Sequence, residues 1–408
     1  MQAKLLLAAL AAALGLSACA NLDGKSAYEV AKISRDRTFT HDYSFNFDGE
    51  MRAYSKAKTT EEIAKDEAAA KAKAEIGVLA DVEGEPDKQL ENQLTNEGME
   101  EFIGQAADFM GEHPTWSEYI ANGRVKYSGA LDLSTKKLEI TPELELNNRN
   151  EYTRVKMPML FDGENMSLTV EPPASIPLFI DIFADLPMRH RLLKEPLQFR
   201  AADVEFLKTL PLKHISEAAV KAGIAANDAL PPEAFEMKEM DAFGKQHGAR
   251  YRVQYQYNPT YEQAVMKAFQ ERFAAELDKL KQTPEQGIKA ETYDQAKEFL
   301  AEVLKGMDEV PKVSQQAMPI WLDSYYDRQG RLKAQRSTLS LNGKKHTFTA
   351  VADLVYSRYG KPEFRFKPQN SRVITWPELM KSFENERTKD HLEAEAVSET
   401  EAGTAAES

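Results

Sequence analysis

The sequence predicts an α+β fold in which an antiparallel sheet is covered on one face by helices. In residues 43–53 and 123–170, apolar and polar side chains alternate, which is the period of a half-buried strand. The turns between these segments are short, and short connections between adjacent strands require antiparallel pairing. Apolar residues at helical spacing in 261–280 and 293–307 predict two amphipathic helices that pack on the sheet.

The strands are expected in two blocks, separated by a region with many prolines. In the first block, we expect Pro142 to break the strand at 138–146 and residues 155–161 to form one continuous strand. Residues 171–250 are expected to be helical in short pieces. Asn342-Gly343 predicts a tight hairpin, because this pair favours a type I′ turn. The strands of the second block are expected at 250–257, 319–326, 331–341, 345–356 and 364–368.

Residues 58–121 differ in character from the strands around them. They hold 5 Lys and 16 Asp or Glu, a net charge of −11, and they are rich in helix-forming residues. We interpret them as an acidic helical insertion, with helices at 63–80 and 87–110, that is mostly solvated and peripheral to folding. A second acidic segment, 384–408, is expected to be a disordered tail, because it combines charge with few large apolar residues.

The N-terminus has the features of a secretory signal. Lys4 precedes an apolar run over 5–14, which is too short for a membrane span, since spanning takes about 20 apolar residues. Leu16-Ser17-Ala18-Cys19 resembles the lipobox of bacterial lipoproteins, and this resemblance implies that Cys19 carries acyl chains such as palmitate. The expected division of the chain is a signal peptide at 1–18, a lipidated tether at 19–40, a sheet-and-helix domain at 41–375 that contains the insertion, and the tail at 384–408.

The residue after the lipidated cysteine bears on whether the protein is held at the inner or the outer membrane. In lipoproteins of enteric bacteria, which this N-terminus resembles, an aspartate at that position favours the inner membrane. Ala20 stands there instead, so the resemblance implies the outer membrane of the cell envelope, with the protein facing the periplasm. The membrane is then a partner through the acyl chains, and several chains hold a protein far better than one. Cys19 is the only cysteine, so lipidation leaves no thiol for a disulfide or for catalysis.

Two segments near the C-terminus resemble a known group of envelope proteins. Asp323–Leu332, followed by two long strands and then by Tyr356–Pro362, is similar to periplasmic and surface lipoproteins of the lipoprotein-carrier fold. In that fold a strongly curved antiparallel sheet forms a half-barrel, and helices pack against its concave face. The resemblance covers 41–57 and 122–375. Members of this group bind acyl chains or have no known ligand, so it implies a hydrophobic-ligand site as one alternative.

No arrangement of residues in the sequence indicates catalysis. The seven histidines all lie more than four residues apart, which excludes a metal pair on one helix or strand. The chain has no G-x-S-x-G, Walker A or G-x-G-x-x-G motif. Its net charge of −13 also argues against nucleic acid as a partner. We therefore expect a protein that is not an enzyme and holds no metal or cofactor, with a hydrolase site assembled from distant residues as the third-ranked alternative.

The strand pattern places methionines and aromatic residues on one predicted apolar face. Methionine suits a pliable apolar site because it fills irregular space. The apolar segment 175–186 is interpreted either as a mobile plug over the sheet or as a buried core helix. The predicted ligand-binding residues are Met157, Met159, Phe161, Phe179 and Phe183. The rest of the face is expected to include Tyr127, Leu131, Val155, Tyr251, Val253, Tyr255, Tyr257, Phe348 and Leu354.

Two functions agree with these features. The first is a non-enzymatic, lipid-anchored envelope protein whose sheet binds an acyl chain or another hydrophobic ligand. The second is a structural or protein-interaction lipoprotein with a fully packed core, in which the acidic insertion binds an envelope protein. An open apolar cavity of about 300 Å³ or more would favour the first function, and a filled core would favour the second.

Overall fold

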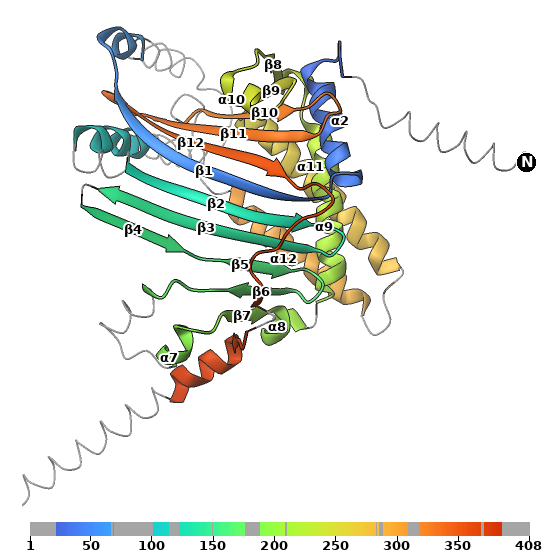
Figure 1. Ribbon diagram of the computed structural model, residues 1–408. Helices are drawn as coiled ribbons and strands as arrows, with labels where there is room; N and C mark the ends of the chain where they lie inside the picture. The colour runs from blue at the N-terminus through green and yellow to red at the C-terminus, as the bar shows by residue number, and fades with distance from the viewer. Residues whose placement is uncertain are drawn as a thin grey trace, which may run out of the picture.

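A computed structural model describes residues 22–66, 68, 101–113, 122–148, 150–175, 188–208, 210–282, 284, 289–308, 318–368 and 371–385. Within these residues the protein is a mixed α+β structure built on one open, curved sheet of thirteen strands (Figure 1). The sheet does not close into a barrel, because its two edge strands stand at opposite ends of the strand order. The expected α+β class and the curved antiparallel sheet are confirmed at this level.

The strands come from two parts of the chain and form two blocks that meet at the centre of the sheet, except that the last strand lies at the outer edge of the first block. The first block comprises β1 (Ser44–Ala57), β2 (Gly123–Asp132), β3 (Lys137–Asn148), β4 (Glu151–Lys156), β5 (Met159–Asp162), β6 (Ser167–Val170) and β7 (Leu197–Arg200). The second comprises β8 (Phe235–Lys238), β9 (Tyr251–Gln256), β10 (Ile320–Tyr326), β11 (Leu332–Asn342), β12 (His346–Ser357) and β13 (Ile374–Thr375). The order is β13-β7-β6-β5-β3-β2-β1-β12-β11-β10-β9-β8, with β4 beside β3. Neighbours are antiparallel except β13, which runs parallel to β7.

The two faces of the sheet differ in chemistry. Successive side chains of a strand point to opposite faces, and cross-strand partners share a face. At the centre Phe47 of β1 pairs with Tyr356 of β12, so the next residue, Asp48, lies on the other face. We call these the apolar face, which carries Phe45, Phe47, Leu131, Ile140, Val253 and Tyr356, and the polar face, which carries Asn46, Asp48, Glu139, Thr141, Arg336 and Asp353.

The first described helix, α2 (Ala27–Thr40), packs on the apolar face at the β8 end of the sheet. Leu22 and Val30 are fully buried there, in a cluster with Val253 of β9. Burying these apolar side chains fixes the segment to the body of the protein. The expectation of a tether over 19–40 is therefore wrong for the part that the structure describes, since this part is folded.

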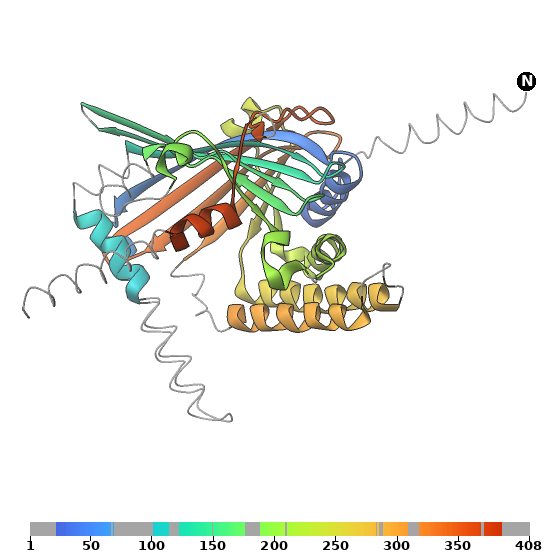
Figure 2. The same ribbon diagram turned by 90° about the horizontal axis from the view of Figure 1, so that it is seen from below.

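Further helices lie on the concave side of the sheet, where α9, α11 and α12 pack chiefly against one another (Figure 2). Alanines of α9 allow close packing against Phe273 and Leu277 of α11. At the far end, the helix over 376–385 buries Leu379 against Ile374 of β13. The helical bounds are α7 (Arg189–Leu192), α8 (Glu205–Lys208), α9 (Leu212–Ala226), α10 (Ala242–Gln246), α11 (Pro259–Gln282) and α12 (Ala290–Asp308), with 3-10 turns at Ala201–Asp203, Asn227–Ala229 and Pro232–Ala234.

The segment between β12 and β13 crosses the polar face (Figure 1). Asn46 of β1 holds it through two hydrogen bonds with the backbone of Glu363, at 2.9 and 2.8 Å. Further along, the buried carboxylate of Glu139 accepts the Phe366 N–H at 2.8 Å. Burial raises the pKa of Glu139, although the backbone donors oppose that shift. The strand expected at 364–368 is therefore wrong, because this segment lies across the sheet and not in it.

The strands around Pro142 and Pro158 differ from the expected ones. Pro142 does not break β3, which runs through it. Its carbonyl accepts the Met157 N–H at 3.0 Å, so its missing N–H faces the edge where the partner of β3 changes from β5 to β4. The continuous strand expected at 155–161 is wrong, because the chain leaves the ladder at Met157-Pro158 and forms two strands, β4 and β5.

Part of the acidic insertion packs against the β11–β12 hairpin. The described residues include a helical turn over 60–66 and a helix over 101–112, in which Ile103 and Ala107 are buried. The carboxylate of Asp108 accepts three backbone N–H groups of the hairpin, from residues 344, 345 and 346, at 2.8–2.9 Å. These contacts show that the insertion is not wholly peripheral. The other residues of the expected helices lie outside the described ranges.

Replacing Asp108 is expected to weaken folding in a pH-dependent way. Burial alone would raise the pKa of Asp108, but the three backbone donors outweigh it and lower the pKa. A pKa that is lower in the folded state stabilises the protein at pH values above the pKa of the unfolded chain, which is about 3.9. This stabilisation is lost as the pH falls through the pKa of the folded protein. Asp108→Asn should therefore lower the free energy of unfolding by about 1–3 kcal/mol at pH 7.

Urea unfolding at pH 7 and pH 3 measures this effect. The difference in free energy of unfolding between wild type and Asp108→Asn should be smaller at pH 3 than at pH 7. Glu112→Gln is the matched control, because the Glu112 carboxylate is largely exposed and pairs only with Lys345 among the described ion pairs. An equal loss for Asp108→Asn at both pH values would contradict the assigned role of the carboxylate.

Candidate functional site

A pocket of ≈290 Å³ lies on the apolar face between α2, α11 and strands β8 to β11. The strands form its floor, and the two helices form its walls. Because α2 and α11 approach the sheet from separate parts of the chain, the pocket is a product of tertiary packing. Its position on the concave side follows from the placement of the helices in Figure 2.

Apolar and aromatic side chains make up most of the pocket's floor. Phe235 of β8 pairs with Tyr255 of β9, which in turn pairs with Leu322 of β10, so the three share the apolar face. The rings of Phe235 and Tyr255 lie 5.7 Å apart, and Tyr28 of α2 stands at the same distance from Phe235. Such a lining suits a hydrocarbon chain or ring, since ligand pockets are mostly apolar with a few placed polar groups.

Polar groups inside the pocket are paired with one another. The Tyr255 hydroxyl donates to the Glu262 carboxylate of α11 at 2.5 Å. Burial raises the pKa of Tyr255, and Glu262 adds to the shift, so the phenol stays protonated at neutral pH. On the floor, the amide of Gln335 donates to the Ser324 hydroxyl at 3.3 Å. This pairing leaves the pocket interior mainly apolar in character.

The pocket's rim carries two cations from one face of α2. Lys32 and Arg35 both reach the carboxylate of Asp228, at 2.5 and 2.6 Å, and Arg35 lies 3.4 Å from Asp36 as well. The hydrogen bond from Lys32 is the largest contribution that lowers the pKa of Asp228. Asp228 is about half exposed, so an anionic group at the rim could displace it and take the same two donors.

The structure brings together some of the predicted ligand-face residues but not the predicted ligand-binding set. Val253 and Tyr255 line the pocket. Met159 and Phe161 lie on the same apolar face but in β5, which is separated from β9 by six intervening strands. Met157 is in the link between β4 and β5, while Phe179 and Phe183 lie outside the described residues. Register also places Tyr127, Leu131, Val155, Tyr251, Phe348 and Leu354 on the apolar face, and Tyr257 directly follows β9.

The sequence analysis missed the pocket residues of α2 and α11, and it also missed Phe235 and Leu322 of the floor. Tyr28, Ala31, Lys32 and Arg35 recur at the helical spacing of three to four residues, and all four line the pocket. This spacing is a signal in the sequence, but the segment was assigned to the tether because it is polar overall. Val265 and Glu262 belong to a helix that was expected, but the sequence does not show which segment this helix packs against.

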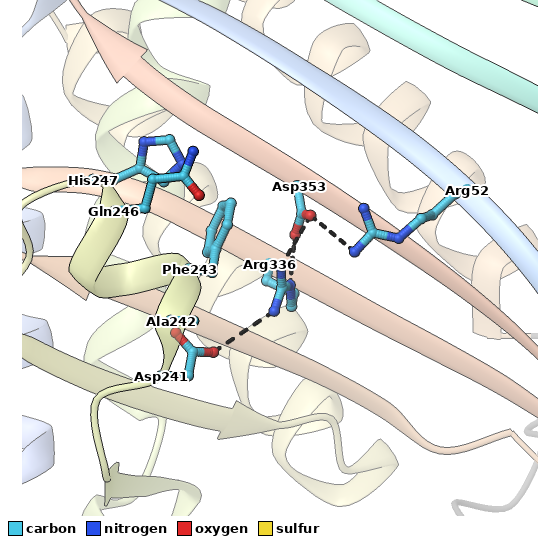
Figure 3. Close-up of a pocket in the computed structure, with 8 residues that line it drawn as sticks. All are labelled: Arg52, Asp241, Ala242, Phe243, Gln246, His247, Arg336 and Asp353. Atoms are coloured by element: carbon cyan, nitrogen blue, oxygen red, sulfur yellow. Dashed lines mark hydrogen bonds and ion pairs between the residues drawn. The ribbon is translucent and has the colours of Figure 1, made fainter.

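A second hollow, of ≈480 Å³, lies on the polar face beside α10 (Figure 3). Arg336 of β11 donates two hydrogen bonds to the Asp353 carboxylate of β12, at 2.6 and 3.0 Å. Arg52 of β1 approaches the same carboxylate at 3.3 Å. The ring of Phe243 from α10 covers the Arg336 guanidinium at 4.3 Å.

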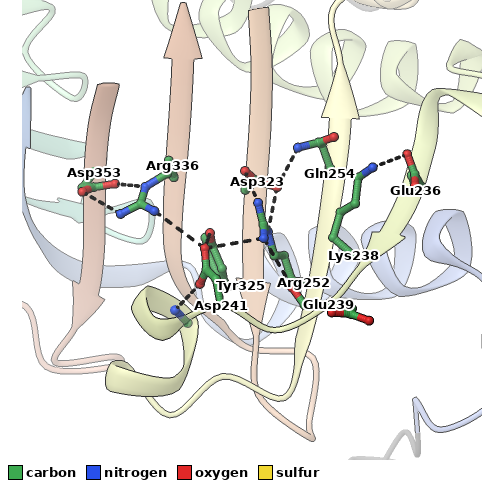
Figure 4. A network of polar contacts seen from close by, with 11 residues as sticks. Glu236, Lys238, Glu239, Asp241, Arg252, Gln254, Asp323, Tyr325, Arg336 and Asp353 are labelled. Carbon is green, nitrogen blue, oxygen red and sulfur yellow. Dashed lines mark hydrogen bonds and ion pairs between the residues drawn. The ribbon is translucent and has the colours of Figure 1, made fainter. Parts of the chain in front are cut away.

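The charges of this hollow continue into a network across β9, β10 and α10 (Figure 4). Arg252 donates two hydrogen bonds to Asp323, each of 3.0 Å. Asp241 lies 3.6 Å from both Arg252 and Arg336, and it accepts the Tyr325 hydroxyl at 2.8 Å. Burial alone would raise the pKa of Asp241, but a backbone N–H of α10, the tyrosine and the two arginines outweigh it and lower the pKa.

The network is internally balanced, which favours a structural role. Each of its three carboxylates faces at least one guanidinium, so no charge is left to attract a ligand. The bidentate geometry of the two Arg–Asp pairs fixes neighbouring strands in register and ties α10 to the sheet. We therefore take the pocket on the apolar face as the candidate functional site.

The described residues show no other chemistry that would redirect this choice. No three His, Cys, Asp or Glu side chains among them are arranged to hold a metal ion. None of the described helices is both long and apolar enough to cross a membrane. Comparison with protein-family models, with curated proteins and with solved structures finds no match to this chain.

Proposed function

We propose that the protein is a lipid-anchored lipoprotein of the cell envelope that binds an amphipathic ligand with an acyl chain, and that it is not an enzyme. Cys19 carries the anchor in this proposal, which holds the protein at the outer membrane on its periplasmic side. An open curved sheet with helices on its concave side supports a lipoprotein-carrier-like half-barrel as the finer description of the fold.

The pocket between α2 and α11 is the observation that carries this proposal. It has an apolar, aromatic floor and a volume of ≈290 Å³, near the lower end of the range of ~300–1,000 Å³ for small-molecule sites. A site of this size accommodates one chain or part of one, and not a whole multi-chain lipid. The chain would lie on the floor formed by Phe235, Tyr255 and Leu322.

The rim favours a ligand with an anionic head. Lys32 and Arg35 stand one turn apart at the mouth and are held by Asp228. A carboxylate or phosphate head group would compete with Asp228 for the same donors, whereas a hydroxyl head group would not. The proposed ligand is therefore an acyl chain with an acidic head.

A charge change at the rim tests this choice of ligand. Asp228→Asn should strengthen the binding of a fluorescent fatty acid, and Lys32→Met should weaken it, each by roughly two- to fivefold, the size expected for exposed ion pairs. The matching fatty alcohol should bind all three proteins equally. Equal changes for the acid and the alcohol would mean that the head group does not lie at this rim.

A second candidate function is binding of an envelope protein. Its support is a set of large apolar side chains in the middle of the apolar face with exposed fractions of 37–39 %, namely Met51, Leu144, Phe161 and Leu168. Exposed apolar patches often mark protein contacts. Most of the acidic insertion that the sequence suggests as a binding surface lies outside the described residues, so the observation here concerns the sheet.

A further inference from the structure

The folded body begins very close to the proposed lipid anchor. Leu22 is buried against the β9–β10 end of the sheet, and the hydroxyl of Tyr251 donates a hydrogen bond to Asp23. Only three residue steps separate Leu22 from Cys19. A fully extended chain spans at most about 3.6 Å per residue, so the anchor lies within roughly 11 Å of Leu22.

Two turns stand at this end of the sheet beside Leu22. The first, 248–250, leads into β9, and the second, 327–331, joins β10 to β11. Gly330 of the second turn has φ +78° and lies against the Leu22 side chain. We call these two turns the anchor-side surface.

The anchor-side surface presents arginines outward. Arg250 and Arg328 are exposed on either side of a shallow cleft of ≈440 Å³ between the turns. The Asp327 carboxylate, the acidic group in this cleft, accepts the backbone N–H groups of Gln329 and Arg331 at 2.8 and 2.9 Å, which satisfies it within its own turn. At the opposite ends of the strands, the β11–β12 hairpin contacts the described part of the insertion through Asp108.

We propose that the anchor-side surface lies directly on the membrane, with Arg250 and Arg328 at the phosphates of anionic lipid head groups. The proposal rests on the lipid anchor of the proposed function. Its partner follows from the short link to Cys19 and from charge, since basic side chains near a bilayer are attracted to anionic lipids. The strands then stand away from the membrane, with the β11–β12 hairpin at the far end.

Site-specific labels on the lipidated protein test this orientation. Lipidation consumes the only native thiol, so a single added cysteine can be labelled alone. Gln329→Cys places the label on the anchor-side surface, and Lys344→Cys is the matched control at the exposed hairpin turn. The twelve residues of β12 separate the two ends by about 40 Å. In vesicles of phosphatidylethanolamine and phosphatidylglycerol with a head-group quencher, the label at 329 should be quenched and the label at 344 should not.

A charge reversal tests the part played by the two arginines. The Cys19→Ser protein without its signal peptide should bind phosphatidylglycerol vesicles weakly through this surface. Arg250→Glu with Arg328→Glu should reduce that binding by roughly fivefold per arginine or more. Arg272→Glu with Lys344→Glu makes the same change in net charge at exposed positions elsewhere and should have a smaller effect.

The outcomes distinguish a wrong membrane-facing surface from a wrong lipid anchor. Equal quenching at both positions, or equal vesicle binding by the two charge-reversed proteins, would overturn the proposed orientation. A Cys19 thiol that stays free to react in the membrane-extracted protein would instead show that the anchor is wrong. In that case the vesicle-binding comparison still decides whether the surface recognises anionic lipid, because it uses the protein without acyl chains.

Discussion

Val265→Trp is expected to weaken the binding of a fatty acid strongly while the protein remains folded. Val265 lines the pocket from α11 and is only partly buried, so a larger side chain can enter the pocket without displacing the core. An indole ring takes up much of a space of ≈290 Å³. Overfilling a packed apolar site costs about 1–3 kcal/mol, which corresponds to a loss of affinity of roughly 5- to 150-fold.

Ala264→Trp provides the matched control for this variant. Ala264 precedes Val265 on the same helix but is exposed, so the same ring there should leave binding unchanged. Titration with a fluorescent fatty acid measures affinity, and thermal unfolding checks that both variants fold. Unchanged binding by a folded Val265→Trp protein would remove the pocket from consideration as the ligand site.

Arg252→Ala should produce the largest loss of stability. Its guanidinium makes a bidentate pair with Asp323, whose side chain is only 5 % exposed. Truncation leaves the Asp323 carboxylate buried, with a hydrogen bond from the Gln254 amide at 3.1 Å. Breaking a buried pair from one side typically costs about 3–5 kcal/mol, because an uncompensated charge remains.

Urea unfolding of single and double variants measures this effect. Replacing both members, Arg252→Met with Asp323→Leu, should recover much of the lost free energy, since no unpaired charge is then buried. The effect of Arg252→Ala on fatty-acid binding should be small under conditions where the protein is folded, because the pair lies on the polar face. A double variant as unstable as Arg252→Ala would contradict the structural role assigned to the network.

The alternation of side chains predicted most strands because one face of the sheet is apolar and the other is polar. It failed where backbone hydrogen bonding, and not the side-chain pattern, determined the path of the chain. Met157-Pro158 interrupts an alternating run because the chain there leaves the ladder, and 364–368 is drawn across the sheet by backbone bonds to Asn46 and Glu139. The short strands β7 and β8 lie in 171–250, which was expected to be helical in short pieces, so they were not predicted.

The N-terminus of helix α2 has a signature in the sequence that the analysis did not use. Ser26 and Glu29 form a capping box, with the Ser26 N–H bonded to the Glu29 carboxylate at 2.9 Å and the Glu29 N–H to the Ser26 hydroxyl at 3.3 Å. This spacing is visible in the sequence. The helix was missed because its contact face uses small residues, such as Ala27 and Ala31, and so shows little hydrophobic contrast.

The candidate site could be predicted only in part. Val253 and Tyr255 belong to the predicted apolar face, since strand alternation fixes the side to which they point. The choice of pocket depends on where α2 and α11 meet the sheet, and contacts between segments so distant in the chain leave no local pattern. The methionines of the first block were favoured for their chemistry, but the sheet order places β5 far from the helices that enclose the pocket.

Native mass spectrometry of the lipidated protein, extracted from its own membrane, tests the central claim most directly. The account predicts that wild-type protein carries one non-covalent acidic lipid in addition to the acyl chains on Cys19, and that Val265→Trp lacks it. A wild-type mass that equals the acylated chain alone would contradict the account. The same mass together with a stoichiometric co-purifying protein would favour the interaction function instead.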